Sequence, residues 1–180
     1  MLRRVLAAVC VLGSLGAGSS DPVSDPLACP GRCERPIGYT LDTHFSAQER
    51  VLAEQAMQVW EGGTNGRVCF VPGGRDLVIE RLDRPQELEP YDGEWQRHVA
   101  LTKGDHIWIV ASRVDEPGEF RALVVHELGH RLGIGHIDDT QQTYMHTTIN
   151  DTPPDLWKHA RLPDRDARAY CAVNACTCSF

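Results

Sequence analysis

The chain has fewer basic than acidic side chains, no long uncharged apolar run, and no repeated or low-complexity segment. Its 180 residues include 18 Lys and Arg against 25 Asp and Glu, which gives a formal net charge of −7. Nucleic acid is therefore not expected as the main partner, because phosphate binding needs a basic surface. No uncharged apolar run reaches the roughly 18 residues that a membrane-spanning helix requires. With 42% apolar and 24% charged residues, the composition predicts one globular domain.

The N-terminus has the order of residues that is typical of exported proteins. Arg3 and Arg4 give a basic start, an apolar stretch follows, and small residues come next. This order favours a secretory signal peptide over residues 1–20, cleaved near Ser19 or Ser20, rather than a short buried helix. Its removal would leave 16 basic against 25 acidic residues, a net charge of −9. We therefore expect a secreted, periplasmic or extracellular protein.

The cysteines that follow the signal peptide are even in number, as in disulfide-bonded exported proteins. They are Cys29, Cys33, Cys69, Cys171, Cys176 and Cys178. We expect them to pair in up to three disulfides. A cysteine zinc site is the less favoured alternative, because Cys176 and Cys178 have a single residue between them, fewer than usual zinc-binding pairs. The first two cysteines lie in a leader rich in Cys and Pro, residues 21–35.

Apolar periodicity and turn signals outline the secondary structure of the remaining domain, residues 36–180. The expected strands are 37–41, 67–71, 76–82 and 107–110. The last strand is apolar throughout, which predicts burial on both faces. The expected helices are about 46–62, which opens with a capping box, about 118–132, and about 162–172. No clear period is found in residues 83–105 or 137–161, and the whole pattern suggests an α+β fold or a mixed sheet with flanking helices.

Residues 126–136, which read HELGHRLGIGH, have the spacing of a metal site. His126 and His130 are four residues apart on a predicted helix, so both imidazoles point from one face and can reach one metal ion. Gly133 allows the left-handed turn that ends the helix, after which His136 can approach from the other side. Three nitrogen donors leave one tetrahedral position for water, the arrangement of a catalytic zinc site. The alternative is three unconnected histidines on an amphipathic helix.

Glu127 follows the first of these histidines and is the candidate general base. Its carboxylate can lie over the open zinc position, take a proton from the water there, and pass the proton to a leaving amine. The zinc would polarise the scissile carbonyl. This is the chemistry of peptide-bond hydrolysis without a covalent intermediate.

The segment 126–136, taken with Met145, resembles the metzincin metallopeptidases and most closely their matrixin-like branch. Metzincins have a Met-containing turn beneath the zinc, and the short interval from His136 to Met145 is similar to that of matrixins rather than astacins. The resemblance covers about residues 36–172. It implies an α+β zincin fold with a mixed five-stranded sheet and an active-site helix. It also implies a cleft between an N-terminal subdomain, about 36–136, and a smaller C-terminal subdomain, about 137–180.

The sequence departs from that family at several positions. Ile137 follows the third histidine, where matrixins usually have Ser, and Asp138 or Asp139 is a candidate anchor for the C-terminal segment. Thr147 stands two residues after Met145, where astacins and serralysins have a Tyr that can bind zinc, so no tyrosine ligand is expected. The leader lacks the switch sequence with which a matrixin propeptide blocks the zinc. Residues 83–105 offer no convincing second zinc site.

These patterns predict a disulfide-stabilised, exported, zinc-dependent endopeptidase that acts as a monomer on protein or peptide substrates. Zinc would be bound by His126, His130 and His136, with Glu127 as general base and Met145 shaping the floor of the site. An extended peptide would lie along an edge strand, where main-chain hydrogen bonds bind it. One alternative is an exported zinc-binding adhesion or inhibitory module without peptidase activity, which would not need Glu127. Another is a metal-dependent amidase with a different substrate class.

Overall fold

The structure, a computed structural model, describes residues 35–137, 142–147 and 152–176. The expected signal peptide and nearly all of the leader lie outside this part of the chain, as do Asp138, Asp139 and Cys178. The division into signal peptide, leader and two subdomains therefore stays a prediction.

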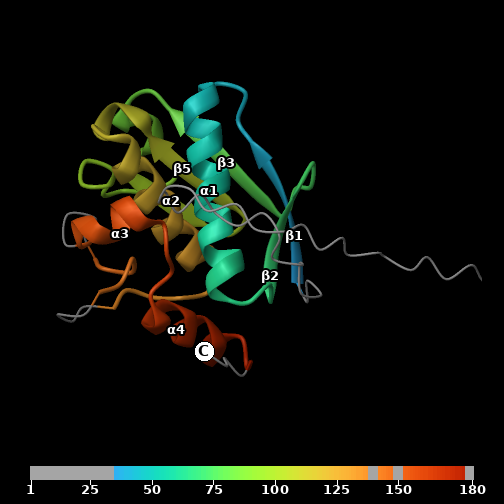
Figure 1. The fold of residues 1–180 in the computed structure, drawn as a ribbon. Helices are drawn as coiled ribbons and strands as arrows, with labels where there is room; N and C mark the ends of the chain where they lie inside the picture. Colours follow the sequence, from blue (N-terminus) through green and yellow to red (C-terminus); the bar gives the residue numbers. More distant parts are fainter. Residues whose placement is uncertain (1–34, 138–141, 148–151, 177–180) are drawn as a thin grey trace, which may run out of the picture.

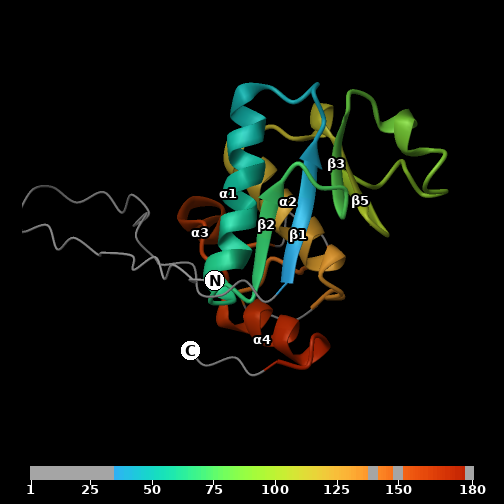
Figure 2. The same cartoon turned by 90° about the vertical axis from the view of Figure 1, so that its right-hand side faces the viewer.

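A mixed five-stranded sheet forms the centre of the fold (Figures 1 and 2). Its strands are β1 (Arg35–Leu41), β2 (Val68–Pro72), β3 (Leu77–Leu82), β4 (Ala100–Lys103) and β5 (His106–Val110). They lie in the order β2-β1-β3-β5-β4. Neighbouring strands are parallel except β4, which pairs antiparallel with β5 and forms one edge of the sheet. This architecture confirms the α+β fold with a mixed five-stranded sheet.

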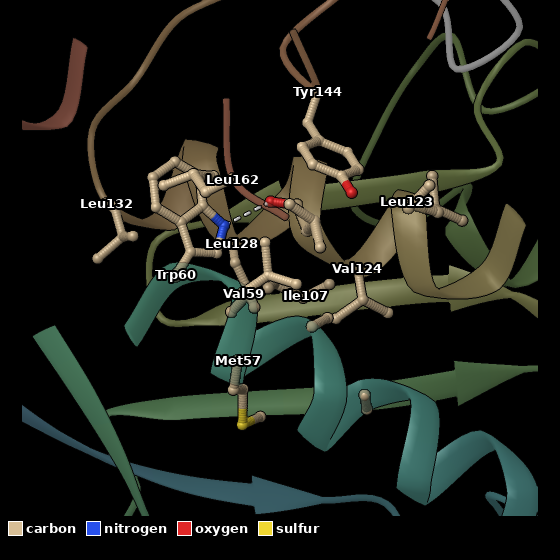
Figure 3. Close-up of a cluster of buried hydrophobic side chains, with 14 of the residues drawn as sticks. Met57, Val59, Trp60, Ile107, Leu123, Val124, Leu128, Leu132, Tyr144 and Leu162 are labelled. Atoms are coloured by element: carbon tan, nitrogen blue, oxygen red, sulfur yellow. Dashed lines mark hydrogen bonds between the residues drawn. The ribbon is translucent and has the colours of Figure 1, made fainter. Parts of the chain in front are cut away.

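Helix α1 (Ala47–Gly63) begins and packs as its sequence predicts. The Glu49 amide donates to Ser46 Oγ at 3.2 Å and the Ser46 amide donates to Glu49 Oε2 at 2.7 Å, which completes the capping box. Trp60, fully buried, donates from Nε1 to the carbonyl oxygen of Val125 at 2.8 Å. Figure 3 shows this bond and the side chains around the ring. It joins α1 to helix α2 (Pro117–Arg131), which lies beside it.

Strand β5 separates two apolar clusters. Ile107 and Ile109 belong to the main core, which the sheet forms with α1 and α2. Trp108 and Val110 pack with Leu88 in a second, smaller cluster. Because side chains alternate between the two faces of a strand, this division explains why four successive apolar residues are all buried. The expected burial of this strand on both faces is confirmed.

Two elements lie in segments where the sequence shows no period. Strand β4 falls within residues 83–105, and helix α3 (Pro154–His159) falls within residues 137–161. A four-residue strand and a six-residue helix are too short to repeat a pattern of burial, so periodicity does not reveal them. Short 3₁₀ helices at Pro85–Leu88 and Ala111–Arg113 add further structure to the loops.

Helix α4 (Asp164–Val173), the last helix in the described part of the chain, packs against the main core through Ala167 and Tyr170. Cys176, just beyond it, is a half-buried free thiol, so the expected pairing of all six cysteines is not seen for this residue. Disulfide stabilisation stays a prediction. None of the helices in the described part of the chain is long and apolar enough to cross a membrane.

Candidate metal centre

The end of helix α2 brings the third histidine back towards the first two. Gly133 adopts a left-handed conformation with φ of 89°. Its amide donates to the carbonyl oxygen of His130 at 3.0 Å, and the Ile134 amide donates to that of Gly129 at 2.9 Å. This pair of bonds is a Schellman motif, the turn that glycine favours after a helix. The turn expected at Gly133 is therefore present.

His126, His130 and His136 converge on one point. The Nε2 atom of His130 lies 3.0 Å from that of His126 and 3.2 Å from that of His136. All three candidate ligand atoms lie within 4.8 Å of one another. An ion with zinc–nitrogen bonds of 2.0–2.1 Å and tetrahedral angles separates its donors by about 3.3 Å. The spacing of the three nitrogens therefore fits one such ion.

Hydrogen bonds from the opposite ring nitrogens leave two of these donors available. His126 Nδ1 lies 2.7 Å from the carbonyl oxygen of Tyr144, and His130 Nδ1 lies 2.9 Å from that of Ile134. A carbonyl oxygen only accepts, so each Nδ1 carries a hydrogen and each Nε2 of the neutral ring has a free lone pair. The Nε2 atoms of His126 and His130 lie 3.0 Å apart, so their lone pairs repel each other unless a cation lies between them. This arrangement, typical of metal-binding histidines, favours an ion at this place.

Burial keeps these rings neutral. It lowers the pKa of His126 to about 4, and the charges of neighbouring histidines act in the same direction. Burial also lowers the pKa of His130. Because a metal binds the neutral imidazole, the site needs no proton loss from these rings at neutral pH.

Met145 lies beneath the histidines, fully buried against helix α2. A Cβ atom on Gly129 would lie only 2.3 Å from the sulfur of Met145, so this helix position has room for glycine alone. The Ile137 amide donates to the carbonyl oxygen of Met145 at 2.7 Å. This bond joins the chain after the third histidine to residues 143–146, here called the methionine turn. Sequence analysis singled out Met145 and Ile137 but missed the role of Gly129.

Asp166 of helix α4 is bound to the methionine turn, a contact that sequence analysis also missed. Its fully buried carboxyl accepts a hydrogen bond from the Tyr144 amide at 2.8 Å and another from the Thr143 hydroxyl. The Thr143 hydroxyl oxygen in turn accepts from the Met145 amide at 2.9 Å. In the sequence, Asp166 is one of two acids in the first turn of a helix, where an acidic side chain is ordinary.

Glu127 is buried beside the histidines, and strand β4 provides its hydrogen-bond partner. Thr102 Oγ1 lies 2.5 Å from Glu127 Oε2 and 3.1 Å from the carbonyl oxygen of the same residue. Burial raises the pKa of Glu127 to about 7, against the lowering effect of the threonine hydroxyl. A carboxyl group with a pKa near neutrality is suited both to accept and to give up a proton at physiological pH.

An open cleft of about 600 Å³ leads to these groups. One wall is the segment 97–102, which ends in edge strand β4, and the other includes Leu123 and the three histidines. Thr147 also lines the cleft. The Tyr144 hydroxyl donates to the carbonyl oxygen of Leu156 at 2.6 Å, so it is directed to the main chain rather than to the histidines.

No other histidine in the described part of the chain joins the converging group. His98 pairs with Asp92, and His106 pairs with Asp105 at 2.8 Å. His146 is buried next to Met145 but is not part of the converging group. Within residues 35–137, 142–147 and 152–176, no second group of three His, Cys, Asp or Glu side chains converges in this way.

Comparison with known proteins gives one family and several similar structures. The family model described as matrixin matches residues 42–173. Archaemetzincin from Methanopyrus kandleri is similar with a TM-score of 0.57 and 11% identity, covering 81% of this chain and 98% of that one. High choriolytic enzyme 1, a hatching-enzyme zinc protease from Oryzias latipes, has a TM-score of 0.50 and 15% identity, covering 82% and 93%. At these identities the two structures support the fold alone. No curated protein sequence matches the chain.

Proposed function

The chain belongs to the matrixin family of metzincin zinc metalloproteases, and from this premise we propose that it is an exported endopeptidase with Glu127 as its general base. In this proposal His126, His130 and His136 hold the zinc. The observation that carries it is the convergence of three histidine nitrogens, two with their lone pairs directed inward, beside a buried carboxyl group in an open cleft.

The chemical role that we propose for each group follows from its position. Zinc, when bound, polarises the scissile carbonyl and makes water more acidic. Glu127 accepts a proton from the attacking water on a carboxylate oxygen and later donates it to the departing amine nitrogen. Its raised pKa, about 7, supports both transfers because neither protonation state is strongly favoured at neutral pH. Met145 packs closely against Gly129, beneath the histidines, and helps to hold their side chains in position.

The substrate we propose is an extended peptide laid along strand β4. This strand is at the edge of the sheet and its residues line the cleft, so its outer main-chain groups are available to a further strand. Main-chain pairing of this kind binds peptides with little regard to sequence, while side-chain pockets supply preference. An adhesion or inhibitory module would need neither the buried Glu127 nor this neighbouring edge.

The test is cleavage of a diverse peptide library by the zinc-loaded protein without residues 1–20. We expect internal cuts in extended peptides, loss of all cuts after treatment with a zinc chelator, and their return when zinc is added. Cleavage that continues in metal-free protein would overturn the proposal. A protein that binds zinc and cuts no peptide would favour the binding-module alternative.

Export is proposed from the basic and then apolar order of the first residues, which Arg3 and Arg4 begin. Expression of the full chain in a host with a secretory pathway, followed by N-terminal sequencing, tests it. We expect protein outside the cytoplasm that begins near residue 20. Intact protein that begins at Met1 and stays in the cytoplasm would contradict export.

A further inference from the structure

Strand β4 directs one polar side chain at helix α2. Side chains alternate along a strand, and here Ala100 joins the main core while Leu101 packs against the smaller cluster of Trp108 on the opposite face. Thr102 therefore shares the face of Ala100, and Lys103 is exposed on the other. The alternation places the Thr102 hydroxyl where the strand meets Glu127.

The Thr102 hydroxyl contacts two oxygens of the same glutamate. Its Oγ1 lies 2.5 Å from Oε2 and 3.1 Å from the main-chain oxygen of Glu127. Among the described residues, no other group hydrogen-bonds to this carboxyl. A glutamate side chain has several rotatable bonds, and burial without a partner is costly for an ionised carboxylate. The Thr102 hydroxyl is therefore the one hydrogen-bond partner of this carboxyl among the described residues.

We propose that Thr102 is a positioning residue that fixes the Glu127 carboxyl in the cleft, an inference that rests on the proposed role of Glu127 as general base. The bond to Oε2 leaves Oε1 for the water that attacks the substrate. Threonine is suited to this task because its branched Cβ restricts χ1, so the hydroxyl direction is fixed by the strand. The same strand is the proposed binding edge for the peptide. One element therefore sets the positions of both substrate and base.

The first test compares Thr102→Val, which keeps the shape and removes the hydroxyl, with Thr102→Ser, which keeps the hydroxyl. We expect Thr102→Val to lower kcat about 10- to 100-fold, the effect of losing a hydrogen bond to a charged group. KM and zinc content should stay close to the parent's, because neither substrate nor metal contacts are removed. Thr102→Ser should recover most of kcat.

A matched control makes the same chemical change away from the cleft. Thr40 on strand β1 donates its hydroxyl to the carbonyl oxygen of Gly74 at 2.7 Å. Thr40→Val should cleave like the parent. Parental kcat in Thr102→Val would overturn the inference while leaving the proposed function intact. A fall in kcat that Thr102→Ser does not reverse would also overturn it, because packing rather than the hydroxyl would then be responsible.

A second measurement does not depend on activity. The infrared carboxylate band of Glu127 can be isolated, in metal-free protein, as the difference between each protein and its Glu127→Gln form. We expect this band to shift in Thr102→Val and to return to the parent's position in Thr102→Ser. An unchanged band in Thr102→Val would overturn the inference. Should the parent cleave no peptide at all, the proposed function fails and the band still decides whether Thr102 fixes the carboxyl.

Discussion

At the scale of single residues, main-chain carbonyl groups orient the histidine rings. The carbonyl oxygens of Tyr144 and Ile134 accept hydrogen bonds from Nδ1 of His126 and His130. Ring orientation therefore depends on the path of the chain more than on the identity of neighbouring side chains. The histidine side chains themselves supply the nitrogens that converge at the candidate metal site.

Replacing His130 by Ala tests the assigned ligands. We expect the parent to bind about one zinc per chain and the variant to lose most of it, because two protein nitrogens alone hold zinc weakly. Metal analysis of the gel-filtered proteins measures the difference. His159→Ala is the control, since it removes an exposed histidine outside the cleft. Parental zinc content in His130→Ala would exclude His130 as a ligand.

Gly129→Ala tests the close approach of the methionine turn. The added Cβ would lie 2.3 Å from Met145 Sδ, so the turn must shift, and we expect a loss of about 1–3 kcal/mol in the free energy of unfolding. Urea denaturation of the metal-free protein measures it. Gly62→Ala, a helical position where a Cβ meets nothing within 4 Å, should be at least as stable as the parent. Equal stability of the two variants would disprove the tight contact.

Local spacing in the sequence is enough to predict the histidines and Glu127, because all lie within residues 126–136. The groups that support them are distant in sequence. Thr102 and Glu127 are 25 residues apart, and Thr143 and Asp166 are 23 apart. Nothing in the residues around Thr102 or Asp166 indicates these partners, since the contacts depend on how strand β4 and helix α4 pack.

At the scale of secondary-structure elements, helix α4 supports the turn beneath the metal centre. The buried carboxyl of Asp166 accepts from the Tyr144 amide and from the Thr143 hydroxyl. Tyr144 in turn supplies the carbonyl oxygen that orients His126. The helix therefore acts on the centre through the turn, without touching the ion site itself.

Asp166→Ala should destabilise the protein because it leaves a buried amide and a buried hydroxyl without an acceptor. The expected loss is about 2–6 kcal/mol in the free energy of unfolding, at about 1–3 kcal/mol for each of the two unpaired groups. Chemical denaturation measures it. Asp164→Ala removes an exposed acid from the first turn of the same helix and should cost less than about 1 kcal/mol. A similar loss of unfolding free energy in both variants would argue against stabilisation of the methionine turn by Asp166.

The elements that the sequence predicts well have strong local signals. Helix α1 has a capping box at Ser46 and a glycine pair at its end, and β5 is a continuous apolar run. Strand β4 has only four residues, one of them polar and one charged, and its place at the sheet edge comes from pairing with β5. Tertiary packing, which no short sequence window contains, decides such elements.

At the scale of the whole molecule, the centre lies where three parts of the chain meet. Helix α2 supplies two histidines and Glu127, edge strand β4 supplies Thr102, and the methionine turn accepts a hydrogen bond from His126 through the carbonyl oxygen of Tyr144. The fold brings these parts together although they are far apart in the sequence. The arrangement leaves the edge strand beside the proposed base, as cleavage of an extended peptide requires.

The most direct test of the account is the turnover of a cleaved peptide by Glu127→Gln, measured with its zinc content. Glutamine keeps the size and can still hydrogen-bond to Thr102, but it cannot accept the proton of water. We predict parental zinc content and a fall in kcat/KM of at least about 100-fold, the usual contribution of a general base. A variant that holds zinc and cleaves the peptide at the parental rate would contradict the account.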